Sequence, residues 1–494
     1  MSSYYSSISC NQPSIFSSTL TMLPDPMFKT LKPKQVVICT HPNPVNHRCH
    51  LHTPRIRVRV LDSPVAFTGP GLPKIAAMIV PVHRETDWNF CTNAGHLQLL
   101  YDYSNLSRLI LISNDLPPDQ QHPSMYILPP VTDTVDSKKL EDALQPLVMS
   151  LHPIVSFKNG LPKPRFLKYE DDLLYREIKA TFVGPFVGEF VVEDVLLECY
   201  DDSVDKKLRR NLRFKRMPNL IQSQVHLYPV NENGKTVTAV VNLENLQKWK
   251  NVRFEIDTEL LVHSYLTPMV TGLLLISPHL NDRIQQRITP RALCLGVGGG
   301  ALLTFLNTKL GFEVVGVEAD QAVLTAATQH FGFNKSGSIQ VIVGDAIDVI
   351  QNFPFQQTKK NADDSDSDPN VKVEGVDCKF DVVMVDLDSS YGYGAPPQDF
   401  VKKSVFEAVR LLLHDHGVVI INVVPLNDQK YKTFVEKLKG VFHKVYEIDV
   451  EEESNCVLMA TLSPSTYSYG YNNAFVEKLR RAIVEDYMES IEEL

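Results

Sequence analysis

The alternation of short apolar runs with helical segments over residues 251–460 is the feature that most constrains the fold of this chain. Such alternation is typical of a parallel sheet that is covered by helices. Several runs are apolar throughout, as expected for strands that are buried on both faces. We therefore predict an α/β fold with a Rossmann-like, seven-stranded sheet. The candidate strands are Ala292–Leu295, Glu313–Val317, Ile339–Val343, Phe380–Val385, Gly417–Val423, Lys444–Ile448 and Cys456–Thr461.

The rest of the chain divides into segments of different character. Residues 54–250 contain short β-like runs such as Ile75–Val82, separated by Pro and Gly, which predicts one or two β-rich modules ahead of the sheet. We assign residues 251–465 to the α/β domain. Within it, residues 356–374 are rich in Asp, Ser and Asn and predict a disordered acidic insertion. Residues 466–494 are predicted to form a C-terminal helical tail.

Residues 1–53 are rich in Ser and nearly free of acids. This composition suits either a disordered tail or an organelle targeting peptide, and the tail is favoured because no arginine precedes Arg48. We therefore predict a cytoplasmic protein, with organelle targeting through this segment as the alternative. Cysteine and histidine also gather between Cys39 and His52, but without the paired spacing of a zinc site, so no metal is predicted.

Composition excludes several classes of protein. The net charge of −9 argues against a general nucleic-acid-binding protein, which needs a basic surface for phosphates. No run of about 18 apolar residues is present, which argues against a membrane span. The eight cysteines include no C-x-x-C pair, so we expect reduced thiols rather than a disulfide framework. Neither nucleic acid nor membrane is therefore expected among the partners.

A glycine-rich turn joins the first candidate strand to a helical segment. It contains Gly296, Gly298 and Gly300. Glycine permits a sharp turn with positive φ and lets a ligand approach the backbone without meeting a Cβ. The N–H groups at the start of the following helix are free to bind a polar or anionic ligand. Because many glycine turns are only tight turns, this motif alone is weak evidence for a site.

Acidic residues follow the next two candidate strands. Glu318 comes at the end of the second strand, about 20 residues after the glycines, where a carboxylate can accept the hydroxyls of a ribose. Asp345 follows the third strand and could accept a hydrogen bond from an adenine amine, while the backbone N–H of Ala346 serves a ring nitrogen. Asp345 would equally suit the N-cap of a helix.

Two further acids, Asp386 and Asp388, follow the fourth strand. Open α/β sheets bind ligands in the crevice at the carboxyl ends of their strands, where these side chains are expected. A carboxylate in that place can hold and orient an incoming amine. Four ligand-type signals at four successive strand ends together predict a nucleoside-binding edge. The G-x-G-x-G pattern lacks the third glycine of a dinucleotide fingerprint, which favours S-adenosylmethionine over a dinucleotide.

With these motifs, the chain resembles the class I S-adenosylmethionine-dependent methyltransferases of the spermidine-synthase-like branch. More narrowly, residues 54–465 are similar to the C-terminal half of the elongation factor 1-alpha lysine and N-terminal methyltransferases. Besides the glycine turn, the matching runs are Ile75–Phe90, Val192–Asp194, Ile221–Ser223, Met269–Leu273, Ala327–Phe333 and Asp386–Ser389. The segments Arg84–Trp88 and Phe331–Phe333 are the distinctive ones.

The resemblance implies a protein methyltransferase with S-adenosylmethionine as cofactor. In the family that the chain resembles, an N-terminal domain modifies a lysine and the C-terminal domain modifies the α-amine of elongation factor 1-alpha. No second glycine turn with a following acid precedes residue 290, so only the C-terminal kind of domain is expected here. The resemblance therefore implies the N-terminal α-amine of translation elongation factor 1-alpha as the substrate. The resemblance also assigns Gln222 to cofactor binding, although an ordinary strand residue is equally plausible there. Asp386 or Asp388 is expected to orient the amine rather than to act as a strong base.

Two other functions stay open. The first is aminopropyl transfer from decarboxylated S-adenosylmethionine to a polyamine. Spermidine synthases carry an acid inside the glycine turn, where this chain has Gly299, and a Tyr-x-Glu upstream, where it has Tyr265-Leu-Thr. Both differences remove carboxylates that would hold a cationic polyamine, so methyl transfer is favoured. The second alternative is a non-catalytic binding protein that has kept the fold.

Overall fold

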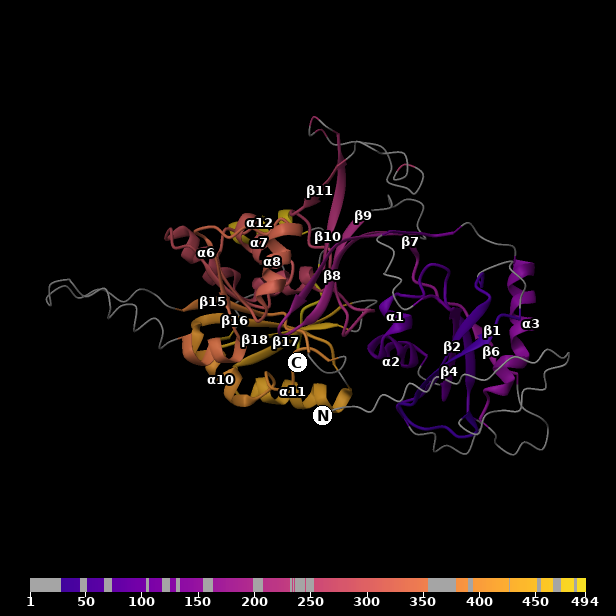
Figure 1. The fold of residues 1–494 in the computed structure, drawn as a ribbon. Helices are drawn as coiled ribbons and strands as arrows, with labels where there is room; N and C mark the ends of the chain where they lie inside the picture. The colour runs from indigo at the N-terminus through magenta and orange to yellow at the C-terminus, as the bar shows by residue number, and fades with distance from the viewer. Residues whose placement is uncertain are drawn as a thin grey trace, which may run out of the picture. The chain divides into compact units, whose positions relative to one another are not determined.

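The computed structural model divides the chain into two compact units (Figure 1). The first comprises Met1–Lys179, Glu193–Lys206 and Arg213–Leu220; the second comprises Ala180–Val192, Lys207–Leu212 and Ile221–Leu494. The residues that the structure describes are 28–44, 51–65, 73–103, 106–117, 125–129, 134–153, 163–198, 208–231, 233, 235, 245, 253–353, 379–389, 394–425, 427–450, 455–464, 472–483 and 487–494. The predicted acidic insertion at 356–374 lies outside them.

An eight-stranded sheet forms the centre of the second unit, in the order β14-β13-β12-β15-β16-β18-β17-β19. Its strands are β12 (Arg291–Leu295), β13 (Glu313–Glu318), β14 (Ile339–Val343), β15 (Phe380–Val385), β16 (Leu413–Val423), β17 (Lys444–Asp449), β18 (Cys456–Thr461) and β19 (Glu492–Glu493). The first five in this order are parallel, and the remaining three run antiparallel to their neighbours. All seven predicted strands are confirmed, and β19 is an eighth that we did not predict.

The order of the strands creates a crevice where ligands of α/β proteins bind. From β12 the chain proceeds outward to β13 and β14 and then returns to the other side of β12 as β15. At such a reversal, the helices that follow neighbouring strands leave toward opposite faces of the sheet. The carboxyl ends of β12 and β15 therefore flank the topological switch point.

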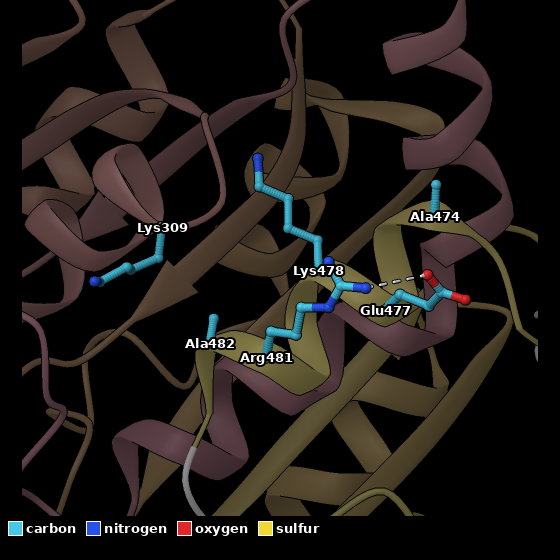
Figure 2. Close-up of a pocket in the computed structure, with 6 residues that line it drawn as sticks. All are labelled: Lys309, Ala474, Glu477, Lys478, Arg481 and Ala482. Atoms are coloured by element: carbon cyan, nitrogen blue, oxygen red, sulfur yellow. Dashed lines mark ion pairs between the residues drawn. The ribbon is translucent and has the colours of Figure 1, made fainter.

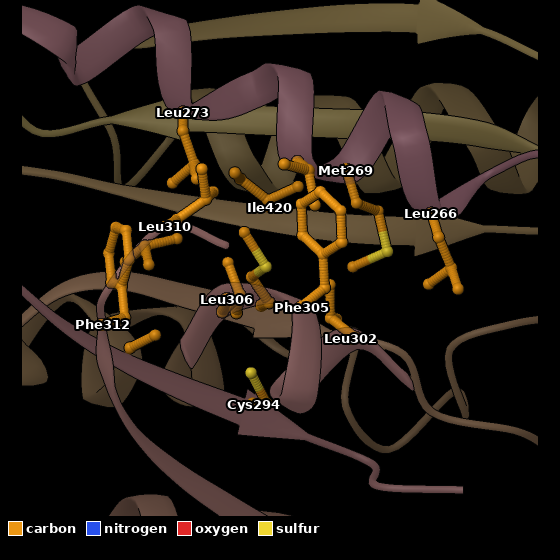
Figure 3. Close-up of a cluster of buried hydrophobic side chains, with 14 of the residues drawn as sticks. Leu266, Met269, Leu273, Cys294, Leu302, Phe305, Leu306, Leu310, Phe312 and Ile420 are labelled. Atoms are coloured by element: carbon orange, nitrogen blue, oxygen red, sulfur yellow. The ribbon is translucent and has the colours of Figure 1, made fainter. Parts of the chain in front are cut away.

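Both faces of this sheet are buried, which explains why its strands are apolar throughout. Ala292 and Cys294 of β12 belong to one core cluster, while Leu293 and Leu295 belong to another. Successive side chains of a strand point to opposite faces, so each face of β12 is covered. Figure 3 shows the first cluster, in which Phe305 packs among side chains from helices and strands of the unit.

Helices of the second unit supply the other side of each core cluster. They are α5 (Leu266–Thr271), the 3₁₀ helix η2 (Gly272–Ile276), α6 (Ser277–Gln285), α7 (Ala301–Thr308), α8 (Gln321–His330), α10 (Lys403–Leu412), α11 (Asp428–Lys439) and α12 (Ala474–Ala482). The predicted helical tail at 466–494 is only partly helical. Phe475 and Leu479 of α12 are buried in the first cluster, and β19 pairs with β17. The described residues 472–483 and 487–494 therefore contribute to the core and to the edge of the large sheet.

The first unit contains a five-stranded sheet in the order β1-β2-β4-β3-β6. Its elements are β1 (Val36–Pro42), β2 (Arg55–Asp62), β3 (Ile75–Ile79), α1 (Trp88–Cys91), α2 (Asn93–Asp102), β4 (Arg108–Asn114), α3 (Thr134–Ser150) and β6 (Arg165–Leu167). Besides the strands expected of the β-rich modules, the unit contains two helices that we did not predict, α2 and α3. Leu140, Leu144, Leu147 and Leu151 recur at helical spacing and pack into the core, a periodicity that we overlooked.

Part of the segment that we predicted to be a disordered tail or targeting peptide is folded. Within residues 1–53, β1 pairs with β2, and Phe28 and Leu51 are buried in the core of the first unit. Alternating apolar residues at Val37 and Cys39 explain the strand, since both pack against that core. Residues 1–27 and 45–50 lie outside the described part of the chain.

A further sheet has six strands in the order β11-β10-β9-β8-β7-β5, in which β10 pairs antiparallel with β11 and β5 with β7. Its strands are β5 (Met125–Ile127), β7 (Leu173–Gly184), β8 (Gly188–Leu197), β9 (Leu208–Phe214), β10 (Ile221–Val230) and β11 (Arg253–Asp257). The start of β10 and the turn between β7 and β8 belong to the second unit, where both contact the carboxyl edge of the large sheet.

Candidate active site

The carboxyl ends of four parallel strands lie side by side, as the sequence motifs require. Backbone hydrogen bonds continue the ladders just beyond the strands. The N–H of Gly296 donates to Val317 O, that of Gly344 to Glu318 O, and that of Asp386 to Leu295 O, each at 2.9 Å. The residues that follow β12, β13, β14 and β15 are thereby held along one edge.

Gly296, Gly298 and Gly300 have positive φ angles of 91°, 52° and 84°. A Cβ at Gly296 would lie 2.1 Å from the backbone oxygen of Asp386, and one at Gly300 would lie 2.3 Å from the Phe333 side chain. Glycine is thus required at these two positions both by the dihedral angle and by close contact. The second clash also explains the distinctive Phe331–Phe333 run, because its aromatic rings pack directly on the glycine turn.

Glu318 lies where we predicted it, at the end of β13, and only 8% of it is exposed. Its Oε2 accepts hydrogen bonds from the N–H groups of Val297 (3.2 Å) and Gly298 (3.3 Å), and its Oε1 accepts from Asp320 (3.1 Å). Burial raises the pKa of Glu318, although these hydrogen bonds act in the opposite direction. A carboxylate offers about four acceptor positions, so capacity for a ligand hydroxyl remains.

Asp320 connects this edge to the turn between β7 and β8. Its Oδ1 accepts from the Ala322 N–H and caps α8, while its Oδ2 accepts from the N–H groups of Phe186 (2.9 Å) and Val187 (3.0 Å). The cap agrees with the place of Asp320 just before α8, whereas no local sequence pattern predicts the second contact. One fully buried carboxylate therefore holds both a helix start and a hairpin turn.

Replacing Asp320 with alanine should destabilise the chain by about 2–3 kcal/mol, because one cap and two buried N–H partners are lost together. Chemical denaturation measures this loss. Asn427→Ala is the matched control, since Asn427 caps α11 through Lys430 N–H alone, and it should cost about 1 kcal/mol. Equal losses in the two variants would show that the contact with the turn contributes nothing.

Asp345 occupies the predicted position after β14, and its capping role is visible. Its Oδ1 accepts from the N–H groups of Ile347 (2.8 Å) and Asp348 (3.1 Å), at the start of the helical segment that begins at residue 346. The Asp345 side chain is exposed and Ala346 is buried. A cap uses only one carboxylate oxygen, so the adenine contact that we predicted for Asp345 and Ala346 is compatible with this arrangement.

Asp386 follows β15 and is held by two neighbours. Its Oδ1 accepts from Asn422 Nδ2 (2.9 Å), and its Oδ2 accepts from the Tyr265 hydroxyl (3.2 Å). Burial is the main cause that raises the pKa of this carboxyl, and the charge of Asp388 adds to it. Asp386 and Asp388 are both half-buried. The hydrogen bonds from Asn422 and Tyr265 therefore fix the direction of the Asp386 carboxylate at the switch point.

Sequence reasoning missed three residues of this site. Asn422 lies near the end of β16, so the rule that polar residues follow buried strands would have found it. Tyr265 precedes α5, and only the folded structure brings it to Asp386. Ser223 accepts a hydrogen bond from the Gly299 N–H at 2.7 Å. Gln222, which we did predict, has a buried Nε2 without a hydrogen-bond partner among the described residues.

A pocket of about 390 Å³ lies elsewhere in the second unit and contains none of the predicted residues. Figure 2 shows its lining: Lys309, Ala474, Glu477, Lys478, Arg481 and Ala482. Its cations are already partnered, because Lys309 pairs with Glu259, Arg481 pairs with Glu477, and Lys478 donates to Leu310 O. This pocket therefore has the character of a solvated surface.

Within the described ranges, no cluster of three or more His, Cys, Asp or Glu side chains is arranged to hold a metal ion. In the same part of the chain, no helix combines the length and the apolar character that a membrane crossing needs.

Comparison with known proteins agrees with the resemblance seen in the sequence. No family model matches the chain. It is 28% identical to the human eEF1A lysine and N-terminal methyltransferase over 430 residues, which cover 83% of this chain and 54% of that protein. The Danio rerio protein of the same name is 27% identical over 426 residues, covering 84% and 55%. The chain thus spans about half the length of the curated relatives it matches.

Solved structures give related matches. Human methyltransferase-like protein 13 in complex with SAH is 27% identical, with a TM-score of 0.35, and the match covers 45% of this chain and 94% of that one. A probable spermidine synthase from Corynebacterium glutamicum is 15% identical, with a TM-score of 0.39 and coverages of 64% and 90%. Over most of its length, the chain is thus a sequence relative of the eEF1A lysine and N-terminal methyltransferases.

Proposed function

We propose that this chain is an S-adenosylmethionine-dependent methyltransferase that modifies the N-terminal α-amine of translation elongation factor 1-alpha. The observation that carries the proposal is the pair of carboxylates on either side of the glycine turn at the switch point, the buried Glu318 and the half-buried Asp386. The names of the relatives supply the substrate. For localisation, the cytoplasm remains our expectation from the sequence.

The residues along this edge fit the nucleoside of the donor. Glu318 would accept from the ribose hydroxyls, and the glycine turn leaves room beside the backbone because no Cβ projects from it. Asp345 and the Ala346 N–H would serve the adenine. Gln222 offers a buried donor that lacks a partner among the described residues, as expected for a group that a ligand satisfies. When bound, S-adenosylmethionine supplies an electrophilic methyl group.

On the acceptor side, Asp386 would hold the amine. The attacking nitrogen must be unprotonated, and an α-amine meets this requirement more readily than a lysine because its pKa is about 8 rather than about 10.4. Asn422 and Tyr265 donate to Asp386 and fix the direction of its carboxylate. The carboxylate thus orients the amine, and positioning of this kind accounts for a large part of catalysis in displacement reactions.

Aminopropyl transfer is less well supported. Spermidine synthases place an acid in the glycine turn, but a Cβ at Gly299 would lie 3.0 Å from the Phe331 ring and 3.1 Å from Ser223. An acidic side chain at that position would require Phe331 or Ser223 to shift. The helix α5 also carries Thr267 where those enzymes carry a glutamate, and Thr267 is buried. A polyamine would thus lose two carboxylate partners.

The deciding experiment is transfer of labelled methyl from S-adenosylmethionine to eEF1A. Substrate with a free α-amine is compared with substrate whose α-amine is acetylated, and putrescine with decarboxylated donor serves as the aminopropyl control. Labelling that persists on the acetylated substrate would refute the N-terminal assignment. A chain that binds no donor by calorimetry would instead be a non-catalytic relative.

Glu318→Gln tests the donor site. The amide keeps the size of the side chain but removes the charge of the carboxylate that would accept hydrogen bonds from the ribose hydroxyls. We therefore expect the Kd for S-adenosylmethionine to rise about 10–100-fold, as for loss of hydrogen bonds to a charged group. In the wild type, donor affinity should fall on acidification at a pH above the ordinary glutamate pKa, because burial raises the pKa of Glu318. Calorimetry over a pH series measures both effects, and unchanged Kd in the variant contradicts the ribose role.

A further inference from the structure

The segment just before α5 contains two polar side chains that the proposed mechanism does not use. His263 and Ser264 each have a buried polar atom, Nε2 and Oγ respectively, without a hydrogen-bond partner in the described part of the chain. The backbone of this segment is ordered by hydrogen bonds from Leu266 N to His263 O and from Met269 N to Tyr265 O, both 3.1 Å. Leaving a buried polar group unpaired is unfavourable, so a ligand that pairs with these two atoms would be bound more tightly.

Both residues are neighbours of Tyr265, which contacts the carboxylate that we assign to the acceptor amine. The His263 ring stacks on the Tyr265 ring, with centroids 5.3 Å apart and planes 25° apart. The Tyr265 hydroxyl in turn donates to Asp386 at 3.2 Å. The segment that precedes α5 is therefore connected to Asp386 through Tyr265.

The first peptide group of a polypeptide lies close to its N-terminal amine. Consecutive Cα atoms are about 3.8 Å apart, so the first peptide group lies within a few ångströms of the α-amine. A peptide whose amine reaches Asp386 would thus carry its first C=O and N–H past Tyr265. The two oxygens of Asp386 already accept hydrogen bonds from Asn422 and Tyr265, and we assign their remaining capacity to the amine. The peptide group therefore needs other partners.

The chemistry of the two groups suits an uncharged ligand. Burial, and in second place the charge of Arg209, lowers the pKa of His263 to about 4, so its imidazole is neutral at physiological pH. A neutral imidazole offers one donor and one acceptor, and the Ser264 hydroxyl can act as either. A peptide group needs an acceptor for its N–H and a donor for its C=O. A cationic side chain here would instead repel an incoming ammonium group.

We propose that His263 and Ser264 form a subsite that hydrogen-bonds the first peptide group of the acceptor, beside the amine position at Asp386. This inference rests on the proposed function and assigns to the enzyme a preference for a polypeptide over a free amino acid or a polyamine. A ligand without a peptide group would leave both buried atoms unpaired. Selectivity for the substrate class would then come from the segment before α5 rather than from Asp386.

The test titrates a short peptide with the N-terminal sequence of eEF1A into the chain saturated with S-adenosylhomocysteine. Two forms of the peptide are compared, one with a free and one with an acetylated α-amine. His263→Phe keeps the ring stack and removes the nitrogens, and Ser264→Ala removes the hydroxyl. Each variant should weaken binding of both forms about three- to tenfold, the usual effect of one lost hydrogen bond, with unchanged affinity for S-adenosylhomocysteine.

Tyr265→Phe is the control, because Tyr265 acts on Asp386 and should weaken binding of the free-amine peptide alone. Wild-type affinity for both peptides in His263→Phe and Ser264→Ala would overturn the subsite, as would a parallel loss of S-adenosylhomocysteine binding. Peptide binding that depends on His263 without any methyl transfer would sustain the subsite and reject the proposed function. A wild-type chain that binds S-adenosylhomocysteine but neither peptide rejects the subsite alone.

Discussion

Asp386→Asn should slow methyl transfer about 100-fold or more while leaving the donor Kd nearly unchanged. The amide has the shape of the carboxylate but lacks the charge that attracts and orients the amine, and misplacement of a reacting group by about 1 Å costs a factor of this size. Asn422 and Tyr265 both donate to the native carboxylate. The amide nitrogen would face one of these donors, so the side chain should also lose its fixed direction. Single-turnover kinetics separates this effect from binding.

Asp388→Asn is the matched control for this experiment. Asp388 follows the same strand, is half-buried like Asp386, and its charge raises the pKa of Asp386. We expect less than a tenfold loss, which is the range for a group that contributes only through its field. A larger loss in Asp388→Asn than in Asp386→Asn would transfer the amine-orienting role to Asp388. Full activity in both variants would remove the acceptor site from this edge.

Asp87→Asn should produce the largest loss of stability, about 3–5 kcal/mol, which is typical of breaking a buried ion pair. Asp87 lies in the distinctive Arg84–Trp88 run and is only 3% exposed. Its carboxylate accepts from Arg84 Nε at 2.6 Å and from both terminal nitrogens of Arg176, at 2.6 and 3.0 Å. The variant would leave two buried guanidinium groups short of a counter-charge. Urea unfolding followed by tryptophan fluorescence measures the loss.

The pH dependence of this contribution has a definite sign. Burial alone would raise the pKa of Asp87, but the charges of Arg176 and Arg84 outweigh it and lower the pKa to about 2, below the ordinary 3.8. Its stabilisation is therefore complete above pH 3.8 and lost as the pH falls through 2. Asp115→Asn is the control, since the Arg57–Asp115 pair is partly exposed and worth at most about 1 kcal/mol. Equal losses in both variants would contradict the role of the buried network.

The sequence predicts the large sheet well because most of its strands are short runs of mainly apolar residues. Phe380–Val385 and Cys456–Thr461 match β15 and β18 to the residue. The prediction for β16 begins at Gly417, yet the strand begins at Leu413. The prediction started too late because polar residues, two of them exposed, occupy the first positions of the strand. In the first unit, α3 was missed for a different reason. Proline and glycine residues between short apolar runs suggested strands. The helical spacing of the leucines in α3 was present in the sequence, but we did not use it.

The site was predictable to the extent that it follows from strand ends. Glu318 and Asp386 come directly after buried strands, and parallel strands end at the same edge. Tyr265 and Ser223 come from segments far away along the chain, and no local pattern relates Tyr265 to Asp386 or Ser223 to Gly299. The second function of Asp320, holding the turn between β7 and β8, is likewise a long-range contact. Such contacts depend on the tertiary fold.

The outer edge of the large sheet has a practical consequence for biochemical work. Glu492 and Glu493 form β19 against β17, Lys444 pairs with Glu493 at 2.7 Å, and the Leu494 N–H donates to Val445 O. An affinity tag fused directly after Leu494 would pull on hydrogen bonds that cover an otherwise open β-strand, and open strands recruit other molecules. A flexible spacer before the tag, or a tag at the other terminus, leaves the pairing of β19 with β17 intact, which should keep purified samples from aggregating through this edge.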